Sequence, residues 1–148
     1  MKKLLFTALI AVAIGTSAFA DGTKLTYKVL NHFKTEFSGA ENVTWKLDNN
    51  FAKASFVYDG EKMEAFYNTE GDLIGTSRVF AFDKLPKSAL ATITKKYPYP
   101  PYKLNECIEF TNAEGEKNYF VGFETSSESL VLQVGTTGDV SVFKKTIK

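Results

Sequence analysis

The sequence predicts an α+β fold in which one helix followed by a four-stranded antiparallel sheet occurs as a tandem repeat, with the helices packed on one face of the sheet. Three observations lead to this prediction. Short runs in which apolar and polar residues alternate are separated by turn residues, as in half-buried strands. Two other segments carry apolar residues at helical spacing. Part of the sequence also occurs twice, which indicates a duplicated unit.

The N-terminal twenty residues have the three parts of a secretory signal. Lys2 and Lys3 precede an apolar run at residues 4–14, and small residues follow up to Ala20. The run is too short to span a bilayer, which takes about 20 residues. We therefore expect residues 1–20 to be a signal peptide cleaved near Ala20. The mature chain, residues 21–148, should have no membrane span and should be periplasmic or secreted.

Two segments of the mature sequence correspond to each other. Residues 69–73 recur as residues 136–140, and apolar residues upstream match at the same offset. The helical segments match at a shorter offset, and the difference falls at residues 97–102, where the second copy has an insertion rich in tyrosine and proline. We interpret the mature chain as a single domain of two repeats, at about 24–82 and 83–148.

Each repeat is expected to begin with a helix. The first helix ends near Gly39, and its apolar stripe consists of Tyr27, Val29, Leu30, Phe33 and Phe37. The second begins after Leu85 with Pro86, because a proline at an early helical position costs no hydrogen bond. Pro98 ends this helix, and its stripe consists of Leu90, Ile93 and Tyr97.

Four strands should follow each helix. In the first repeat they are expected at residues 43–47, 52–58, 63–67 and 73–80, and in the second at residues 104–110, 119–123, 130–134 and 140–147. Asp59-Gly60 is a strong hairpin signal, and the other connections are also short enough to require antiparallel meanders. We expect the two sheets to join into one curved sheet, although alternation does not determine how they join.

Several of these segments together resemble a known family. The segments are Trp45 on the first strand, Phe56 and Tyr58 before Asp59-Gly60, Ala65-Phe66-Tyr67, Gly71-Asp72-Leu73, and Leu85-Pro86 at the start of a helix. Together they resemble the PepSY-like periplasmic proteins of Bacteroidetes. That family is similar in fold to the beta-lactamase inhibitory protein, a tandem of two helix-plus-four-strand units. The resemblance covers nearly all of the mature chain. It implies a beta-lactamase-inhibitor-like binding protein and, for some members, regulation by calcium.

Residue types that carry common enzyme chemistry are scarce. His32 is the sole histidine and Cys107 the sole cysteine, too few for a tetrahedral zinc site or a nucleophile paired with histidine. Phosphate-binding glycine loops are absent, and the near balance of basic and acidic residues gives no reason to expect nucleic acid. We predict no catalytic residue, no metal ligand, no cofactor and no enzyme activity; a carboxylate-based hydrolase is the remaining enzymatic alternative.

Acidic turns leave a further alternative open. Such turns occur at residues 48–50, 59–61 and 70–72, and calcium binds through oxygen ligands. None of the three has the acid spacing of a twelve-residue calcium loop, and Asp, Asn and Gly are common in any tight turn. A calcium- or small-ligand-responsive periplasmic protein is therefore the alternative function.

Apolar residues on the expected open sheet face are the first candidate partner-binding site. Alternation places Val57, Phe66, Phe120 and Val131 on the face opposite the helices. On an exposed polar face such residues mark an interaction patch. In the competing interpretation, this face is covered within the same molecule or its apolar residues are merely scattered.

The insertion at residues 97–102 is the second candidate. Its prolines stiffen the backbone, so that Tyr99 and Tyr102 can present a preorganised aromatic surface. A rigid linker whose rings fold onto the core is the alternative. The predicted function is a non-enzymatic exported binding module, inhibitor-like or otherwise protein-binding, with an unidentified envelope or secreted protein as its partner. The sequence leaves its oligomeric state open.

Overall fold

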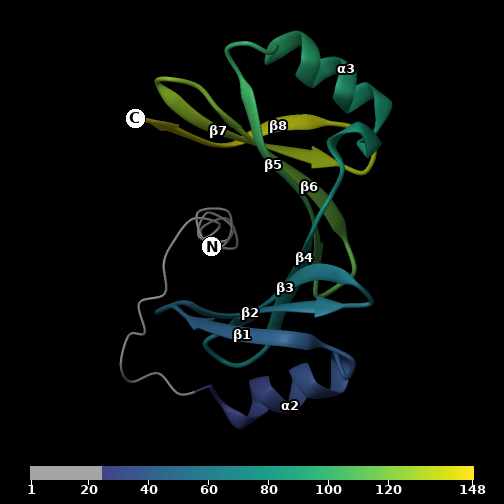
Figure 1. The fold of residues 1–148 in the computed structure, drawn as a ribbon, viewed down its shortest axis with the longest axis vertical. Coiled ribbons are helices and arrows are strands. Elements are labelled where there is room, and N and C mark those ends of the chain that lie inside the picture. Colours follow the sequence, from purple (N-terminus) through teal and green to yellow (C-terminus); the bar gives the residue numbers. More distant parts are fainter. Residues whose placement is uncertain (1–24) are drawn as a thin grey trace. The chain divides into compact units, whose positions relative to one another are not determined.

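A computed structural model describes residues 25–148, and the predicted signal peptide, residues 1–20, lies outside them. Figure 1 shows the elements in chain order. They are α2 (Tyr27–Glu36), β1 (Glu41–Leu47), β2 (Phe51–Tyr58), β3 (Glu61–Asn68), β4 (Leu73–Val79), the 3-10 turn η1 (Phe82–Lys84), α3 (Lys87–Lys96), β5 (Lys103–Asn112), β6 (Lys117–Glu124), β7 (Glu128–Gly135) and β8 (Val140–Ile147). Neither helix in the described range is long and apolar enough to cross a membrane.

The predicted tandem of two helix-plus-four-strand units is wrong. The strands form one eight-stranded antiparallel sheet in the order β1 to β8, and with two helices in residues 25–148 the fold is mostly β. Strand β4 explains the difference, because it continues the sheet by pairing with β5, from Gly75 opposite Asn112 to Val79 opposite Ile108. The expected junction into one sheet is therefore confirmed, whereas the expected tandem of two four-stranded units is not.

The chain divides into two compact units, Met1–Ile74 and Gly75–Lys148. In the first unit, α2 packs on β2 and β3. The helix contributes two phenylalanines, and three of the strand residues beneath it are alanines, with Ala54 opposite Ala65. The core of this unit consists of Val29, Phe33, Phe37, Ala52, Ala54, Phe56, Ala65 and Tyr67. The small strand residues let the helix approach closely enough for its phenylalanines to fill the space.

The buried stripe of α2 differs from the predicted one. Tyr27 and Leu30 are 83% and 42% exposed, whereas Val29, Phe33 and Phe37, spaced four residues apart, are buried. The side-chain oxygen of Thr26 accepts a hydrogen bond of 3.3 Å from the backbone N–H of Val29, which caps the helix and begins it at Tyr27.

In the second unit the helix contributes smaller core residues than α2 does in the first. The helix α3 contributes Ala89 and Ile93, while the strands carry the larger residues. The core consists of Leu85, Ala89, Ile93, Cys107, Val121, Phe123, Leu130, Leu132 and Val134, with Leu90 and Tyr97 packed at its edge. Pro86 is the N-cap residue of α3 and Tyr97 its C-cap residue, so the helix is slightly shorter at each end than the sequence predicts.

The Asp59-Gly60 hairpin is confirmed in detail. Strands β2 and β3 are joined there, and Asp59 and Gly60 have φ angles of 50° and 79°. Positive φ at both central residues is the geometry of a type I′ turn, which matches the twist of the two strands. The turn sets the register that places Ala54 opposite Ala65, and so positions the core beneath α2.

Candidate functional site

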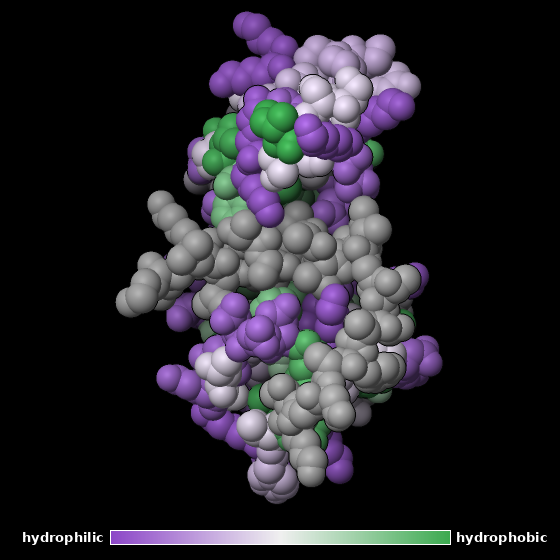
Figure 2. Space-filling model, turned by 90° about the vertical axis from the view of Figure 1, so that its left-hand side faces the viewer, coloured by the Kyte–Doolittle hydropathy of each residue, from purple (hydrophilic) through white to green (hydrophobic). Residues whose placement is uncertain are grey.

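In each unit, the sheet face opposite the helix is not the exposed face that the sequence predicts. Phe66, Phe120 and Val131 are 1%, 3% and 9% exposed, and Val57 is half-buried. The expectation that these residues are solvent-accessible is therefore wrong for the first three. Whether any of the four binds a partner stays a prediction. In Figure 2, the visible surface of both units carries mainly hydrophilic side chains with small apolar areas among them.

Ring contacts within each unit accompany this burial. In the first unit Phe66 lies 6.2 Å from Phe51, and in the second Phe120 lies 5.1 Å from Phe143 and 6.5 Å from Phe110, measured between ring centroids. Phe51, Phe66, Phe110, Phe120 and Val131 belong to neither helix-side core. Alternation identified the face on which these residues lie, but alternation does not reveal whether a face is covered.

Buried charges on the strands are paired. The Nζ atom of Lys53 lies 2.6 Å from Oε1 of Glu64. Glu109 lies 3.0 Å from Nε of Arg78 and 3.3 Å from Nζ of Lys117. A buried charge that is paired with a charge of opposite sign has a structural role, because the pairing stabilises its charged form. These groups therefore supply no free acid or base.

An open aromatic pocket lies in the second unit. It has a volume of about 390 Å³, within the range of about 300–1,000 Å³ that is typical of ligand pockets. Its walls come from η1, the end of α3, the loop that follows α3, β5 and β6. The lining residues are Phe82, Ile93, Thr94, Tyr97, Pro98, Tyr99, Tyr102, Leu104 and Phe123, and we call this site the aromatic pocket.

The predicted insertion builds one wall of the aromatic pocket. The backbone N–H of Tyr97 donates to the carbonyl of Ile93 at 2.8 Å, ending α3, and the N–H of Tyr102 donates to the carbonyl of Pro98 at 3.2 Å, closing the loop. The Tyr97 ring lies 5.2 Å from Tyr102 and stacks on Phe123 at 6.2 Å. The three prolines of the insertion and these ring contacts preorganise the wall, so that binding costs little conformational entropy.

The mouth of the aromatic pocket is accessible and has one polar side. Tyr99 and Leu104 are 76% and 48% exposed, while Tyr102 is half-buried. The Tyr102 hydroxyl donates to Glu128 at 3.3 Å, and Glu128 pairs with Lys145 at 2.7 Å. The hydrogen bond and charge of Lys145 hold the pKa of Glu128 below its usual range, and the same pair raises the pKa of Lys145. The arrangement can hold an apolar group with a polar edge.

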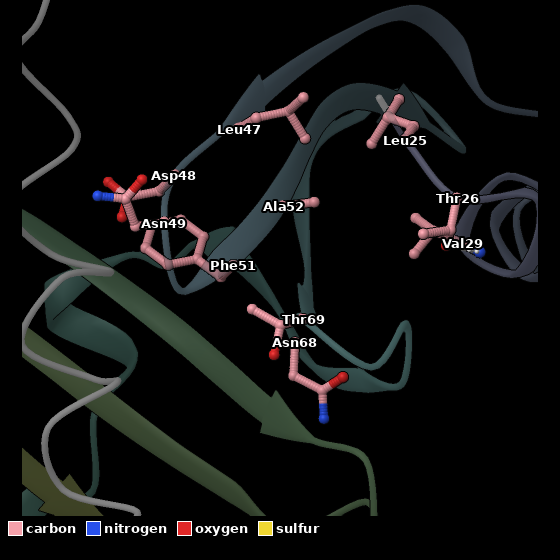
Figure 3. Close-up of a pocket in the computed structure, with 10 residues that line it drawn as sticks. All are labelled: Leu25, Thr26, Val29, Leu47, Asp48, Asn49, Phe51, Ala52, Asn68 and Thr69. Atoms are coloured by element: carbon pink, nitrogen blue, oxygen red, sulfur yellow. Dashed lines mark hydrogen bonds between the residues drawn. The ribbon is translucent and has the colours of Figure 1, made fainter. Parts of the chain in front are cut away.

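The first unit contains a smaller cavity of about 200 Å³ (Figure 3). Figure 3 shows its side chains coming from the start of α2, from the turn between β1 and β2, and from the turn after β3. The apolar residues are Leu25, Val29, Leu47, Phe51 and Ala52, and the polar ones are Thr26, Asp48, Asn49, Asn68 and Thr69. The volume corresponds to about seven water molecules, so that this cavity suits a much smaller group than the aromatic pocket does.

The histidine and the cysteine lie in structural settings. Burial, followed by the charge of Glu106, raises the pKa of the Cys107 thiol to about 11. Nδ1 of His32 lies 3.1 Å from the hydroxyl of Tyr67, which packs in the first core. Within residues 25–148, no group of three or more histidine, cysteine, aspartate or glutamate side chains is placed to hold a metal ion.

The structure thus brings two of the predicted site residues together. Tyr99 and Tyr102 both line the aromatic pocket. Sequence reasoning missed Phe82 as a site residue, and it placed Leu104 and Phe123 on expected strands without assigning them to a site. These residues lie on segments distant from the insertion, and only the fold places them beside it.

Several solved structures have the same fold. A BLIP-like protein from Bacteroides fragilis is 13% identical with a TM-score of 0.67, over 86% of this chain and 89% of that chain. A DUF2874 family protein from Bacteroides ovatus is 16% identical with a TM-score of 0.68, over 85% and 89%. A protein named as a candidate periplasmic protein from Bacteroides eggerthii is 11% identical with a TM-score of 0.69, over 84% and 90%.

At the level of sequence, no protein-family model and no curated protein matches this chain. Identities this low establish a shared fold and leave function open. The PepSY part of the predicted resemblance stays a prediction. The beta-lactamase-inhibitor-like part is confirmed as a likeness of fold: the chain shares its architecture with BLIP-like and DUF2874 family proteins of Bacteroides.

Proposed function

We propose that this chain is a non-enzymatic, exported protein-binding module whose aromatic pocket receives an apolar side chain of the partner protein. One observation carries the proposal: the pocket is open and largely preformed, with the exposed Tyr99 and Leu104 at its mouth. Tyrosine side chains that combine a large apolar ring with a polar tip are typical anchors of protein interfaces.

Two further features support a binding module rather than an enzyme. The buried charges Lys53 and Glu109 are consumed by ion pairs, and the Cys107 thiol is buried. The fold is also that of a BLIP-like protein, and a neighbour named as a candidate periplasmic protein agrees with export. The partner would then be an envelope or secreted protein.

Selection of phage-displayed peptides on the mature chain tests this proposal. The selected peptides should share an apolar anchor residue, and Tyr99→Ala should weaken their binding by about tenfold or more, because hot-spot truncations cost about 2 kcal/mol. Tyr27→Ala is the matched control, since Tyr27 is an equally exposed tyrosine on α2, away from the pocket. A second pair compares Leu104→Asp with Leu30→Asp, two similarly exposed leucines.

The binding role of the pocket is wrong if Tyr99→Ala and Tyr27→Ala bind the selected peptides equally well. It is also wrong if the selected peptides share no apolar residue. Circular dichroism melts of all four variants separate a loss of binding from a loss of folding.

The first-unit cavity favours a second candidate function, small-ligand binding. Its lining of five apolar and five polar residues suits a compact amphiphilic molecule (Figure 3). Ala52 lines the cavity and also belongs to the core beneath α2. Ala52→Leu should fill the space, and a thermal melt checks that the larger side chain leaves the fold intact. Screening a library of small fragments by NMR tests the candidate: hits should perturb Leu25 and Val29 in the wild type and not in Ala52→Leu. Hits that persist unchanged in the variant would exclude this cavity.

A further inference from the structure

We infer that the segment recognised at the aromatic pocket is acidic as well as apolar, an aromatic or aliphatic residue flanked by aspartate or glutamate. This inference rests on the proposed function and adds the charge of the partner to it. The reason is the distribution of charge around the pocket, which differs from that of the chain as a whole.

The part of the chain that forms two walls of the pocket is exclusively basic. The segment from Lys84 to Lys103 contains α3 and the loop after it, and it carries five lysines and no acidic residue. In contrast, basic and acidic residues nearly balance over the whole sequence. The helix α2 of the first unit has no such excess, since Glu36 accompanies its two lysines. The segment that supplies these two walls therefore has an excess of positive charge, and the nearest acidic residue before it is Asp83 of η1.

These lysines are not neutralised by their surroundings. None of Lys84, Lys87, Lys95, Lys96 and Lys103 forms an ion pair within residues 25–148. In the part of the chain that the structure describes, Glu128 is the carboxylate that accepts a hydrogen bond from a pocket residue, Tyr102. Glu128 is already paired with Lys145, at 2.7 Å. An incoming carboxylate would therefore meet positive charge without having to break an existing salt bridge.

Lys95, Lys96 and Lys103 are all adjacent in sequence to the pocket lining, and Lys103 lies between the lining residues Tyr102 and Leu104. Lys95 and Lys96 form the last turn of α3, between Thr94 and Tyr97, which also line the pocket. Both lysines are exposed. A side chain inserted into the pocket would bring its neighbours along the partner chain within reach of these two ammonium groups. Exposed charge pairs of this kind contribute modest affinity and strong selectivity between partners.

A peptide fits these observations better than a nucleic acid does. Single-stranded nucleic acids are bound by a row of aromatic rings along a basic groove, whereas here the rings line a single open pocket. The near-neutral chain also lacks the overall positive field that nucleic-acid-binding domains use. We therefore assign the basic surface to carboxylates of a protein partner.

Four synthetic peptides test the inference against the wild-type mature chain. The peptides have the same length and differ only in their central tripeptide, which is Glu-Phe-Glu, Gln-Phe-Gln, Lys-Phe-Lys or Glu-Ala-Glu. Dissociation constants are measured by NMR titration at low and at high salt. We expect Glu-Phe-Glu to bind about fivefold or more tightly than Gln-Phe-Gln at low salt, with the preference shrinking as salt screens the charges. Lys-Phe-Lys and Glu-Ala-Glu should bind most weakly.

A pair of variants locates the effect. Lys95→Gln/Lys96→Gln removes two positive charges beside the pocket without placing carboxylates at the end of a helix, and should abolish the preference for Glu-Phe-Glu over Gln-Phe-Gln. The control variant Lys34→Gln/Lys46→Gln removes two exposed lysines of the first unit. It should bind Glu-Phe-Glu more tightly than Gln-Phe-Gln, as the wild type does. Thermal melts check that both variants fold.

The outcomes separate this inference from the proposed function. Equal binding of Glu-Phe-Glu and Gln-Phe-Gln, with Tyr99→Ala still abolishing both, overturns the acidic partner and leaves the pocket proposal standing. Failure of every phenylalanine peptide to bind overturns both. Binding of a short oligothymidylate as tightly as Glu-Phe-Glu also overturns the inference, since the basic surface would then recognise phosphate.

Discussion

Cys107 lies on β5 beneath α3, where it packs among the apolar residues of the second core. Its side chain is 6% exposed, and Val121 is its partner across the sheet. Burial raises the pKa of the thiol to about 11, and the nearby Glu106 adds to this effect. A raised pKa keeps the thiol protonated, and the protonated form is a poor nucleophile.

The thiol should therefore be inert in the folded chain. At pH 8 a group with a pKa of about 11 is ionised in about one molecule in a thousand. Alkylation by iodoacetamide should be at least about a hundredfold slower in buffer than in concentrated urea, as followed by mass spectrometry. Equal rates in the two solvents would contradict the buried position of Cys107.

Tyr67 offers a second test at the residue scale. Its side chain is completely buried, and its hydroxyl lies 3.1 Å from Nδ1 of His32. Burial, and then the negative charge of Glu36, raises its pKa to about 12. In the unfolded chain the same hydroxyl has a pKa of about 10. Between these two values the unfolded state loses its proton first, so that this residue contributes less stability as the pH rises.

The wild type should therefore lose stability between about pH 10 and pH 12 more steeply than Tyr67→Phe. Urea unfolding across this range measures the free energy of unfolding of both proteins. Because both contain all the other tyrosines, the contribution of those residues cancels in the difference between the two values. A free-energy difference between the two proteins that stays constant over the range would show that Tyr67 is not a buried neutral phenol.

Each helix docks through its first turn on a hairpin glycine of its own unit. Gly71 has a φ of 83°, and a Cβ atom there would meet the Lys28 side chain at 3.1 Å. Gly138 has a φ of 93°, and a Cβ atom there would overlap Oγ of Ser88 and approach Pro86 at 3.1 Å. The left-handed φ and the close approach both require glycine.

Gly138→Ala should destabilise the protein by about 2 kcal/mol or more, from backbone strain together with the clash against α3. Gly115→Ala is the matched control, because Gly115 also has a positive φ, 86°, but no atom lies within 4 Å of its Cβ position. It should cost about 1 kcal/mol. Urea denaturation measures both, and equal losses would mean that the contact with α3 contributes nothing.

The outer strands of the sheet, β1 and β8, carry features that disfavour pairing with another chain. In β1, Asn42 has a φ of 53° and the register with β2 shifts between Glu41 and Thr44. In β8, Lys144 and Lys145 occupy the middle of the strand. Bulges and lysines on edge strands interrupt the regular hydrogen-bonding edge that aggregation requires. The aromatic pocket, rather than a strand edge, is thus the better candidate for recognition.

At the scale of the whole molecule, the sequence predicts the elements well, because their signals are local. The alternation in Val43 to Leu47 and the Asp59-Gly60 turn each lie within a few residues, and the structure has the expected strand and hairpin. The first helix stripe is less accurate, since Tyr27 has helical spacing to the core residues but lies at the capped first position.

Long-range relations are where prediction fails. No local pattern in the sequence predicts that β4 pairs with β5. The repeated pattern therefore favours a tandem of two helix-plus-four-strand units, and this interpretation is incorrect. Likewise, alternation placed Phe66 and Phe120 on the face away from the helices, but their burial depends on side chains elsewhere in the fold. Tyr99 and Tyr102 could be selected as candidates because prolines and tyrosines cluster there, whereas Phe82 and Leu104 carry no local signal.

The most direct test of a binding pocket in the second unit is photocrosslinking. The Glu-Phe-Glu peptide is made with benzoylphenylalanine in place of phenylalanine, irradiated with the mature chain, and the adducts are mapped by mass spectrometry. The account predicts adducts at residues 94–104, and at Phe82 or Phe123, with their yield lowered by Tyr99→Ala. Adducts concentrated in residues 25–74, or a yield unchanged by Tyr99→Ala, would contradict it.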